Sequence, residues 1–224
     1  TVSNVDAHHD FIGGQSATGA VINNKVIITG SEFYSAIGGS STTDSSVVSG
    51  NTVTVTNSTL SGGASSAIVG GHGFGNTLIE NNAVVVTNTS ATLVYGGLNN
   101  DGGTTQGNTI ILSNSTVSRH ATAGYSASGA VTGNTVTVQD GTTVNGNVRG
   151  GYSGTGTATG NTVNLIDGTV TGIVSGGSGG ASAVDVFTGN TLNVAKRFTV
   201  GGLNNVEYLN FTLPADMQAN SSDA

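Results

Sequence analysis

The chain contains no cysteine and no tryptophan, and only 8% of its residues are charged. The lack of cysteine excludes a disulfide framework and is compatible with export through an oxidising compartment. Few leucine, lysine, glutamate and arginine residues remain to build long amphipathic helices. No apolar run approaches the roughly 18 residues of a membrane-spanning helix. These absences predict a chain that is almost entirely β-structure.

Positive charge is also scarce, since 12 acidic residues outweigh 5 basic ones and give a net charge of −7. A nucleic-acid partner is therefore not expected, because such a partner requires a basic face. The glycine-rich stretches carry neither the Lys-Ser/Thr pair of a phosphate-binding loop nor the aspartate of calcium-binding glycine repeats. No signal peptide opens the chain, so we expect any targeting segment to be removed or to lie outside this segment. No cofactor is predicted.

What the sequence does contain is a repeat. A Gly-Gly pair, replaced once by Ala-Gly, recurs at spacings of 25, 32, 26, 27, 27, 26 and 25 residues. The first residues of these pairs are Gly13, Gly38, Gly70, Gly96, Ala123, Gly150, Gly176 and Gly201. A second marker is an asparagine that opens a strand-like run, at Asn24, Asn51, Asn82, Asn108, Asn134, Asn161 and Asn190. Both spacings lengthen near residues 60–80, so one insertion, either SGGASSA or HGFGNTLIE, explains both deviations.

The residues after each asparagine alternate between apolar and polar. The second and fourth positions after it are aliphatic in all seven copies, as in Val53 and Val55 or Val136 and Val138. A period of two describes a strand with one buried face. Two further columns recur in the repeat. A turn residue lies six residues after each asparagine. A small, mainly apolar residue lies two residues before the Gly-Gly pairs. The turn residues are Gly30, Asn57, Asn88, Asn114, Asp140, Asp167 and Lys196, and the second column is Ala36, Ile68, Val94, Ala121, Val148, Val174 and Thr199.

One such unit cannot bury its own apolar face, but stacked units close a continuous core. The sequence therefore predicts an all-β, right-handed parallel β-helix of about eight coils of roughly 26 residues. We expect residues 1–224 to form a single domain, with coils over about 1–202 and a cap-like segment over 203–224. The asparagines should align into a structural ladder, with aliphatic columns inside and threonines outside.

The C-terminal stretch FTVGGLNNVEYLNFTLPADMQA, together with the GG…GNTV coils, resembles the passenger region of type V autotransporters of Gram-negative bacteria. The resemblance implies a secreted or surface-displayed passenger, and adhesion or aggregation is the usual role in that family. It also implies a bacterial cell-surface location, with membrane attachment only through a C-terminal β-barrel outside this sequence. The function that follows is a non-enzymatic adhesin or stalk in host or cell–cell adhesion, with self-association or a host protein or glycan as partner.

Two other functions remain open on the same fold. A carbohydrate-active enzyme, a polysaccharide lyase or hydrolase, would need carboxylates clustered in a groove. Asp140 and Asp167 share a column, but each precedes a glycine, which is typical of a tight turn. An ice-binding solenoid would need a regular Thr-x-Thr array, and only Thr52/Thr54 and Thr135/Thr137 provide the pair.

The candidate binding residues are aromatic. Tyr34, Tyr95, Tyr125 and Tyr152 lie near successive Gly-Gly corners, and Arg149 shares with Tyr95 the position just before the pair. Exposed aromatic residues often anchor recognition of proteins and sugars, so we expect these five residues to form a contact surface. The alternative is that the rings cover gaps left by glycine.

A polar cluster of Asp6, His8, His9 and Asp10 offers imidazole and carboxylate ligands to a metal. Neighbouring residues of a strand point to opposite faces, which hinders chelation by both histidines. No metal site is therefore predicted, and the cluster is interpreted as a polar edge.

Overall fold

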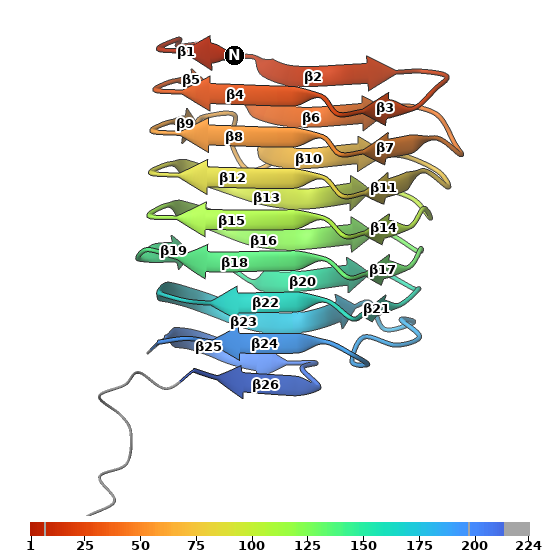
Figure 1. Cartoon of the computed structure of the whole chain (residues 1–224), viewed down its shortest axis with the longest axis vertical. Helices are drawn as coiled ribbons and strands as arrows, with labels where there is room; N and C mark the ends of the chain where they lie inside the picture. The colour runs from red at the N-terminus through yellow and green to blue at the C-terminus, as the bar shows by residue number, and fades with distance from the viewer. Residues whose placement is uncertain (7, 197, 213–224) are drawn as a thin grey trace, which may run out of the picture.

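The computed structural model describes residues 1–6, 8–196 and 198–212. Over these residues the protein is a β-solenoid of about seven turns, one fewer than expected, with all paired strands parallel. Three sheets run along the length of the rod (Figure 1). In Figure 1 the front strands point left and the rear strands point right while the chain descends, so the coil is right-handed.

Two of the three sheets contain most of the strands. The nine-stranded sheet contains β1 (Val2–Ser3), β4 (Lys25–Thr29), β8 (Thr52–Thr56), β12 (Ala83–Thr87), β15 (Thr109–Ser113), β18 (Thr135–Gln139), β22 (Thr162–Leu165), β24 (Thr191–Val194) and β26 (Tyr208–Phe211). The eleven-stranded sheet contains β2 (Asp10–Ser16), β5 (Glu32–Phe33), β6 (Ser35–Ser41), β9 (Thr59–Leu60), β10 (Ala67–Gly73), β13 (Ser90–Asn99), β16 (Thr116–Ser126), β19 (Thr142–Val144), β20 (Val148–Ser153), β23 (Gly168–Gly179) and β25 (Thr199–Asn204).

A third, six-stranded sheet closes each coil. Its strands are β3 (Val21–Ile22), β7 (Val47–Ser49), β11 (Leu78–Glu80), β14 (Thr105–Gln106), β17 (Val131–Thr132) and β21 (Ala158–Thr159). These short strands lie within the return segment of the repeat, which is rich in glycine, serine and threonine around them. The part of the chain that the structure describes contains no helix that is long and apolar enough to cross a membrane.

The core consists of aliphatic columns along the rod. Val53, Val84, Ile110, Val136 and Val163 pair with one another in register on successive strands, and all five are fully buried. The predicted interior of the nine-stranded sheet is therefore confirmed. On the eleven-stranded sheet the column from Ala36 to Val174 is equally buried and packs against it.

The Gly-Gly pair and the asparagine of each coil form one structural element. A Cβ atom built on Gly38 would lie 2.5 Å from the carbonyl oxygen of Gly70 in the next coil, and one built on Gly39 would lie 2.6 Å from the Cγ of Asn51. Both glycines of the pair thus face the interior, and the strand bends there around the asparagine side chain. The second position is glycine in every pair, whereas Ala123 shows that the first position tolerates a methyl group.

The seven asparagines stack inside this corner as a continuous ladder. In the first six, Nδ2 donates to the Oδ1 of the asparagine in the next coil, over distances of 2.8 to 3.3 Å. That same Oδ1 accepts the backbone N–H of the preceding asparagine at 2.9 to 3.0 Å. Every member except Asn24 is buried, and no buried side-chain nitrogen or oxygen among the described residues lacks a partner. The ladder fixes the register of neighbouring coils.

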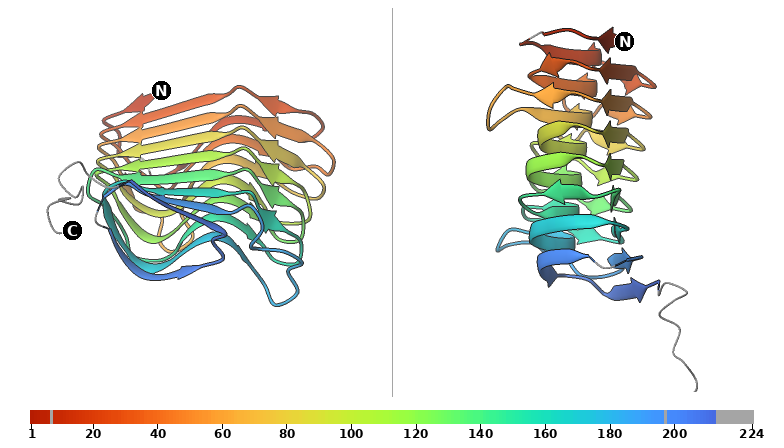
Figure 2. Two further views of the ribbon diagram at one scale, coloured as in Figure 1. Left: turned by 60° about the horizontal axis from the view of Figure 1, so that its bottom comes forward. Right: turned by 90° about the vertical axis from the view of Figure 1, so that its left-hand side faces the viewer.

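The insertion is SGGASSA, because residues 61–66 of it belong to no strand, whereas residues 72–73 and 78–80 of HGFGNTLIE belong to the regular strands β10 and β11. Residues 61–66 form a loop between β9 and β10 that projects from the rod (right-hand view of Figure 2, orange). Arg119, on β16, donates a hydrogen bond from Nη1 to the carbonyl oxygen of Ala64 at 3.0 Å. The loop is therefore held against strands two coils further along.

The last coil differs from the predicted repeat. Gly202 pairs with Ile173 and Leu203 pairs with Val174, so Gly201-Gly202 is out of register with Gly176-Gly177, and exposed Thr199 does not continue the buried column. The expected cap begins as ordinary rungs, because residues 208–211 form β26, which pairs with β24. The remainder of that segment, from residue 213, lies outside the described residues.

The predicted turn column is confirmed over five coils and fails in the sixth. Gly30, Asn57, Asn88, Asn114 and Asp140 all have φ between 44° and 59°. Asp167 is not among the described residues with positive φ. Val138 pairs with Leu165 but Thr142 pairs with Gly168, so the turn that contains Asp167 is one residue shorter. The two aspartates therefore do not share a regular column.

Candidate contact surface

The inward bend at each Gly-Gly pair turns the residues that flank it outward. Tyr95, just before the pair on β13, is in register with Thr122 on β16, which is in register with Arg149 on β20. On the other side of the pair, Tyr125 on β16 is in register with Tyr152 on β20. The two columns border the same bend of the eleven-stranded sheet, so their side chains can meet across it.

Four of the five predicted residues do meet there, and we refer to Tyr95, Tyr125, Arg149 and Tyr152 as the tyrosine–arginine cluster. The rings of Tyr125 and Tyr152 are stacked, with centroids 5.0 Å apart and planes 7° apart. Tyr95 packs edge-on against Tyr125 at 6.0 Å and 78°. The guanidinium Cζ of Arg149 lies 5.7 Å from the centre of the Tyr152 ring, within the range of a cation–π interaction.

The cluster covers the sheet beneath it. Thr122 lies between Tyr95 and Arg149 on the outward column, yet only 1% of it is exposed. The rings themselves remain partly exposed. The two predicted roles, rings that cover the glycine gaps and rings that form a contact surface, are therefore compatible. The inner side of the cluster packs on the sheet, and its outer side is partly exposed to solvent.

Two arginines lie at the cluster, although the chain as a whole is acidic. Arg149 belongs to the cluster and Arg119 lies nearby on β16. Burial, followed by the charges of Arg149 and Arg119, lowers the pKa of His120 below its ordinary value. Burial also lowers the pKa of Arg149, while the three tyrosines counteract this effect. Two of the five basic residues of the chain therefore gather at one place on the rod.

Burial also changes the tyrosines. It raises the pKa of Tyr95 above its ordinary value, and Tyr125 raises it further, whereas Arg149 and Arg119 lower it. Burial raises the pKa of Tyr125 as well, and Tyr152 adds to the effect. A neutral phenol is thus favoured at Tyr95 and Tyr125 in the folded protein.

We predict that the protein loses stability as the pH rises above about 10, the ordinary tyrosine pKa. In that range the unfolded chain gives up its phenolic protons first, so the folded state binds more protons and the free energy of unfolding falls with pH. The fall ends once the pH exceeds the raised pKa values of Tyr95 and Tyr125. Phenolate absorbance and thermal unfolding measured across this range test the prediction. Tyr95→Phe should reduce the loss, and an identical profile in that variant would contradict the assignment.

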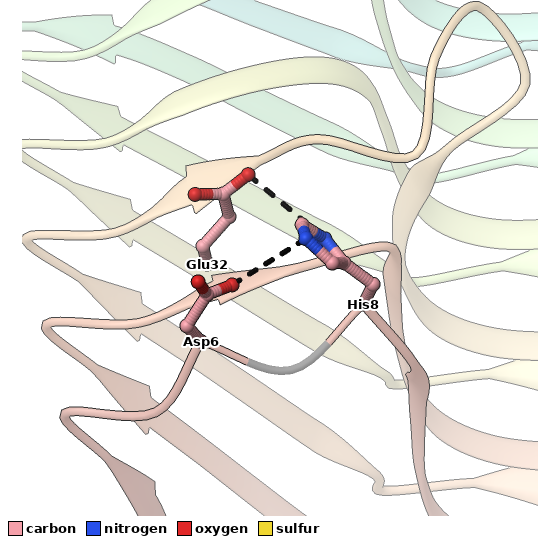
Figure 3. A group of neighbouring side chains, drawn as sticks. All are labelled: Asp6, His8 and Glu32. Atoms are coloured by element: carbon pink, nitrogen blue, oxygen red, sulfur yellow. Dashed lines mark ion pairs between the residues drawn. The ribbon is translucent and has the colours of Figure 1, made fainter.

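Tyr34, the fifth predicted residue, lies elsewhere. It stands between β5 and β6 and stacks on His8, with centroids 5.4 Å apart and planes 29° apart. His8 belongs to a second polar group that includes Asp6 and Glu32 (Figure 3). His8 Nε2 lies 3.6 Å from Asp6 Oδ1, and His8 Nδ1 lies 4.0 Å from Glu32 Oε1.

This group differs from the cluster expected from the sequence, because Glu32 replaces His9 and Asp10. One ligand atom from each of Asp6, His8 and Glu32 lies within 4.8 Å of the others, so the three side chains could approach one cation. The side chains are 76%, 54% and 43% exposed, respectively, and the two carboxylates approach different nitrogens of the ring. An imidazole offers one nitrogen to a given ion, so the observed arrangement is that of a histidine between two acids.

Two other histidines have structural contacts in the described part of the chain. His120 accepts the backbone N–H of Asn147 through Nδ1 at 3.0 Å. His72 packs against Phe74 at 4.8 Å, and burial lowers its pKa.

The outer face of the nine-stranded sheet carries two columns of side chains. One column consists mostly of threonines, at Thr52, Thr109, Thr135, Thr162 and Thr191, but the next column mixes isoleucine, threonine, valine and asparagine. That face is therefore not a regular threonine array.

Sequence reasoning missed two residues of these sites, although a signal for each existed. Glu32 follows Asp6 by 26 residues, which is one repeat, and the two residues form an isolated parallel bridge. Arg119 directly precedes His120 in the sequence and lies close to the Tyr95 column. Comparisons with protein-family models, curated proteins and solved structures found no match to this chain. The assignment of function therefore depends on the site itself.

Proposed function

We propose that this chain is a non-enzymatic passenger segment displayed on the surface of a Gram-negative bacterium, where it acts as a stalk and an adhesive face. The observation that carries the proposal is the tyrosine–arginine cluster, which gathers partly exposed rings and a cation on a rod with few other charges. The resemblance of the coils and of residues 198–219 to autotransporter passengers supports the location.

The rod supports a role in presentation. At about 4.7–4.9 Å per coil, seven coils extend over roughly 35 Å. The buried asparagine ladder and the aliphatic columns run along this length without interruption from Asn51 to Asn190. Such a scaffold holds a contact surface at a fixed distance and orientation, which is the geometric task of a stalk.

The chemistry of the cluster suits recognition of proteins or sugars. Aromatic faces pack on apolar faces of a ligand, and their hydroxyl groups donate and accept hydrogen bonds at the rim. Arg149 adds a fork of donors that can bind a carboxylate in two places. A host glycan, a host protein or a second copy of the chain would each supply such groups. Self-association is favoured by the low charge of the rod, and many weak contacts between cells would sum through multivalency.

We expect cells that display the chain to clump or to adhere to a receptor-bearing surface. In the Tyr125→Ala/Tyr152→Ala variant the affinity of this binding should fall by about tenfold or more. Hot-spot aromatic residues typically contribute at least 2 kcal/mol, and about 1.4 kcal/mol corresponds to a tenfold change in affinity. Clumping assays and adhesion to glycan or protein surfaces measure the effect. Tyr208→Ala, an exposed tyrosine on β26, is the matched control. Equal adhesion by all three proteins would remove the proposal.

A further inference from the structure

Three copies of an N-glycosylation acceptor motif occupy the same corner of three consecutive coils. The motif Asn-x-Ser/Thr occurs as Asn57-Ser58-Thr59, Asn88-Thr89-Ser90 and Asn114-Ser115-Thr116. These segments follow β8, β12 and β15 at the turn that leaves the nine-stranded sheet. The corresponding turn of the next coil, Asp140-Gly141-Thr142, lacks the asparagine. We call the three segments the acceptor column.

The backbone presents the acceptor asparagine and the defining hydroxyl on the same outer corner. Asn57, Asn88 and Asn114 are exposed and adopt φ of 50°, 49° and 44°. The middle residues Ser58, Thr89 and Ser115 are buried, whereas Thr59, Ser90 and Thr116 are exposed again. A transferase that reads the motif therefore finds both of its recognition groups on the solvent side of the folded rod.

The hydrogen bonds of the column leave room for a substituent. Asn88 donates from Nδ2 to Asn57 Oδ1 at 3.0 Å, and Asn114 donates from Nδ2 to Asn88 Oδ1 at 2.8 Å. A side-chain amide has two N–H groups, and this ladder uses one of them at Asn88, one at Asn114 and neither at Asn57. The buried ladder differs, because Asn108, for example, spends both N–H groups, on Ile79 and Asn134. That asparagine begins Asn-Thr-Ile and is not an acceptor motif.

The surface beside the column is hollow and uncharged. An open hollow of about 500 Å³ is lined by eight of the nine residues of the three motifs, namely Asn57, Ser58, Thr59, Asn88, Thr89, Ser90, Asn114 and Thr116. Amide and hydroxyl groups of this kind hydrogen-bond to the hydroxyl groups of a sugar. The corner therefore offers an acceptor nitrogen, a recognition hydroxyl and space for a pyranose ring at one place.

We propose that Asn57, Asn88 and Asn114 are N-glycosylation sites of the folded protein, and that their substrate is a sugar activated at its anomeric carbon by a phosphate or diphosphate leaving group. In the transfer, the Nδ2 atom forms a bond to the anomeric carbon while the bond from that carbon to the phosphate oxygen breaks. One amide proton passes to a base of the transferase, and the leaving group departs with the bonding electrons. The modified amide keeps one N–H for the ladder.

The spacing of the column limits how many positions are filled. Neighbouring coils are about 4.8 Å apart, so sugars on adjacent asparagines would crowd one another, whereas Asn57 and Asn114 are separated by about 9.6 Å, two strand spacings. We expect each chain to carry one or two sugars on the column, with alternate coils preferred.

The test is incubation of the folded chain with a bacterial asparagine glucosyltransferase and UDP-glucose, followed by intact mass and peptide mapping. We expect a gain of one or two hexoses that map to Asn57, Asn88 or Asn114. The Thr59→Ala/Ser90→Ala/Thr116→Ala variant keeps all three asparagines but removes the motif, and should lose all modification of the column. Those three hydroxyls donate no hydrogen bond within the described residues, so the variant should fold, which circular dichroism verifies.

The chain contains its own activity control. Asn210-Phe211-Thr212 and Asn220-Ser221-Ser222 are further acceptor motifs away from the column, and sugar on their peptides shows that the enzyme is active. The proposal is overturned if the folded column stays unmodified while the urea-unfolded chain accepts sugar at the same three asparagines. It is equally overturned if the triple variant is modified on the column to the same extent as the original chain.

Discussion

Replacement of Asn108 by alanine is expected to lower the free energy of unfolding by roughly 5–7 kcal/mol. Its Oδ1 accepts the backbone N–H and the Nδ2 of Asn82 at 3.0 and 2.9 Å, and its Nδ2 donates to Ile79 O and Asn134 Oδ1 at 3.1 and 3.0 Å. Each of these four bonds contributes about 1 kcal/mol net, and the buried N–H of Asn82 would remain without a partner, at a further cost of about 1–3 kcal/mol.

Thermal unfolding followed by circular dichroism measures this loss, which should appear as a fall in Tm of roughly 10–20 °C for a domain of this size. The control is Asn88→Gly in the exposed column. That change also removes two asparagine–asparagine hydrogen bonds, but they are solvent-exposed, and glycine adopts the φ of 49° without strain. We expect the control to lose less than about 1 kcal/mol. Equal losses in the two variants would show that burial of the inner ladder contributes nothing.

The sequence was sufficient to predict the core, because register in a solenoid is repeated in every coil. Val84 and Val86 are recognisable as buried from their own strand, and the same alternation in the six other copies removes the ambiguity of a single short strand.

The spacings also contain enough information to decide which of the two candidate segments is the insertion. Both lengthened intervals contain residues 51–70, which include SGGASSA and exclude all of HGFGNTLIE.

The prediction failed where a marker occurred without its partner. Gly201-Gly202 resembles the other pairs in sequence. In the next rung, however, the position that corresponds to Asn190 is Glu207, only 17 residues further along the chain. The asparagine ladder therefore does not continue beside Gly201-Gly202. A Gly-Gly pair bends inward only where an asparagine side chain fills the corner. Single-position markers therefore predict register less well than the two markers taken together.

The candidate surface was predicted in part for the same reason. Tyr125 and Tyr152 each directly follow the second glycine of a pair, so the repeat alone places them side by side. Tyr34 precedes Gly38 by four residues and belongs to the turn after β5, where no such rule applies. Sequence spacing places the insertion loop, but it carries no information about the loop's conformation or about the hydrogen bond that Arg119 donates to it.

The second large effect is expected at the glycine that faces the ladder. In Gly39→Ala the new Cβ would lie 2.6 Å from both Cγ and Nδ2 of Asn51 and 2.8 Å from its Oδ1. Asn51 cannot move aside, because its side chain is held by hydrogen bonds to Asn24, Val21 and Asn82. Overpacking costs about 1–3 kcal/mol, and each ladder bond that breaks adds about 1 kcal/mol, so we expect a loss of roughly 3–5 kcal/mol in the free energy of unfolding.

A double-mutant cycle separates this clash from a general intolerance of alanine. In Gly39→Ala/Asn51→Ala the methyl group enters space that the asparagine has vacated, so the combined loss should be smaller than the sum of the two single losses by about 1–3 kcal/mol. Gly19→Ala is the control for the substitution itself, because the nearest atom to its Cβ would be Ser16 Oγ at 3.7 Å. Strict additivity in the cycle would mean that the two residues do not oppose each other, and the Gly-Gly pair would then require an explanation independent of the asparagine ladder.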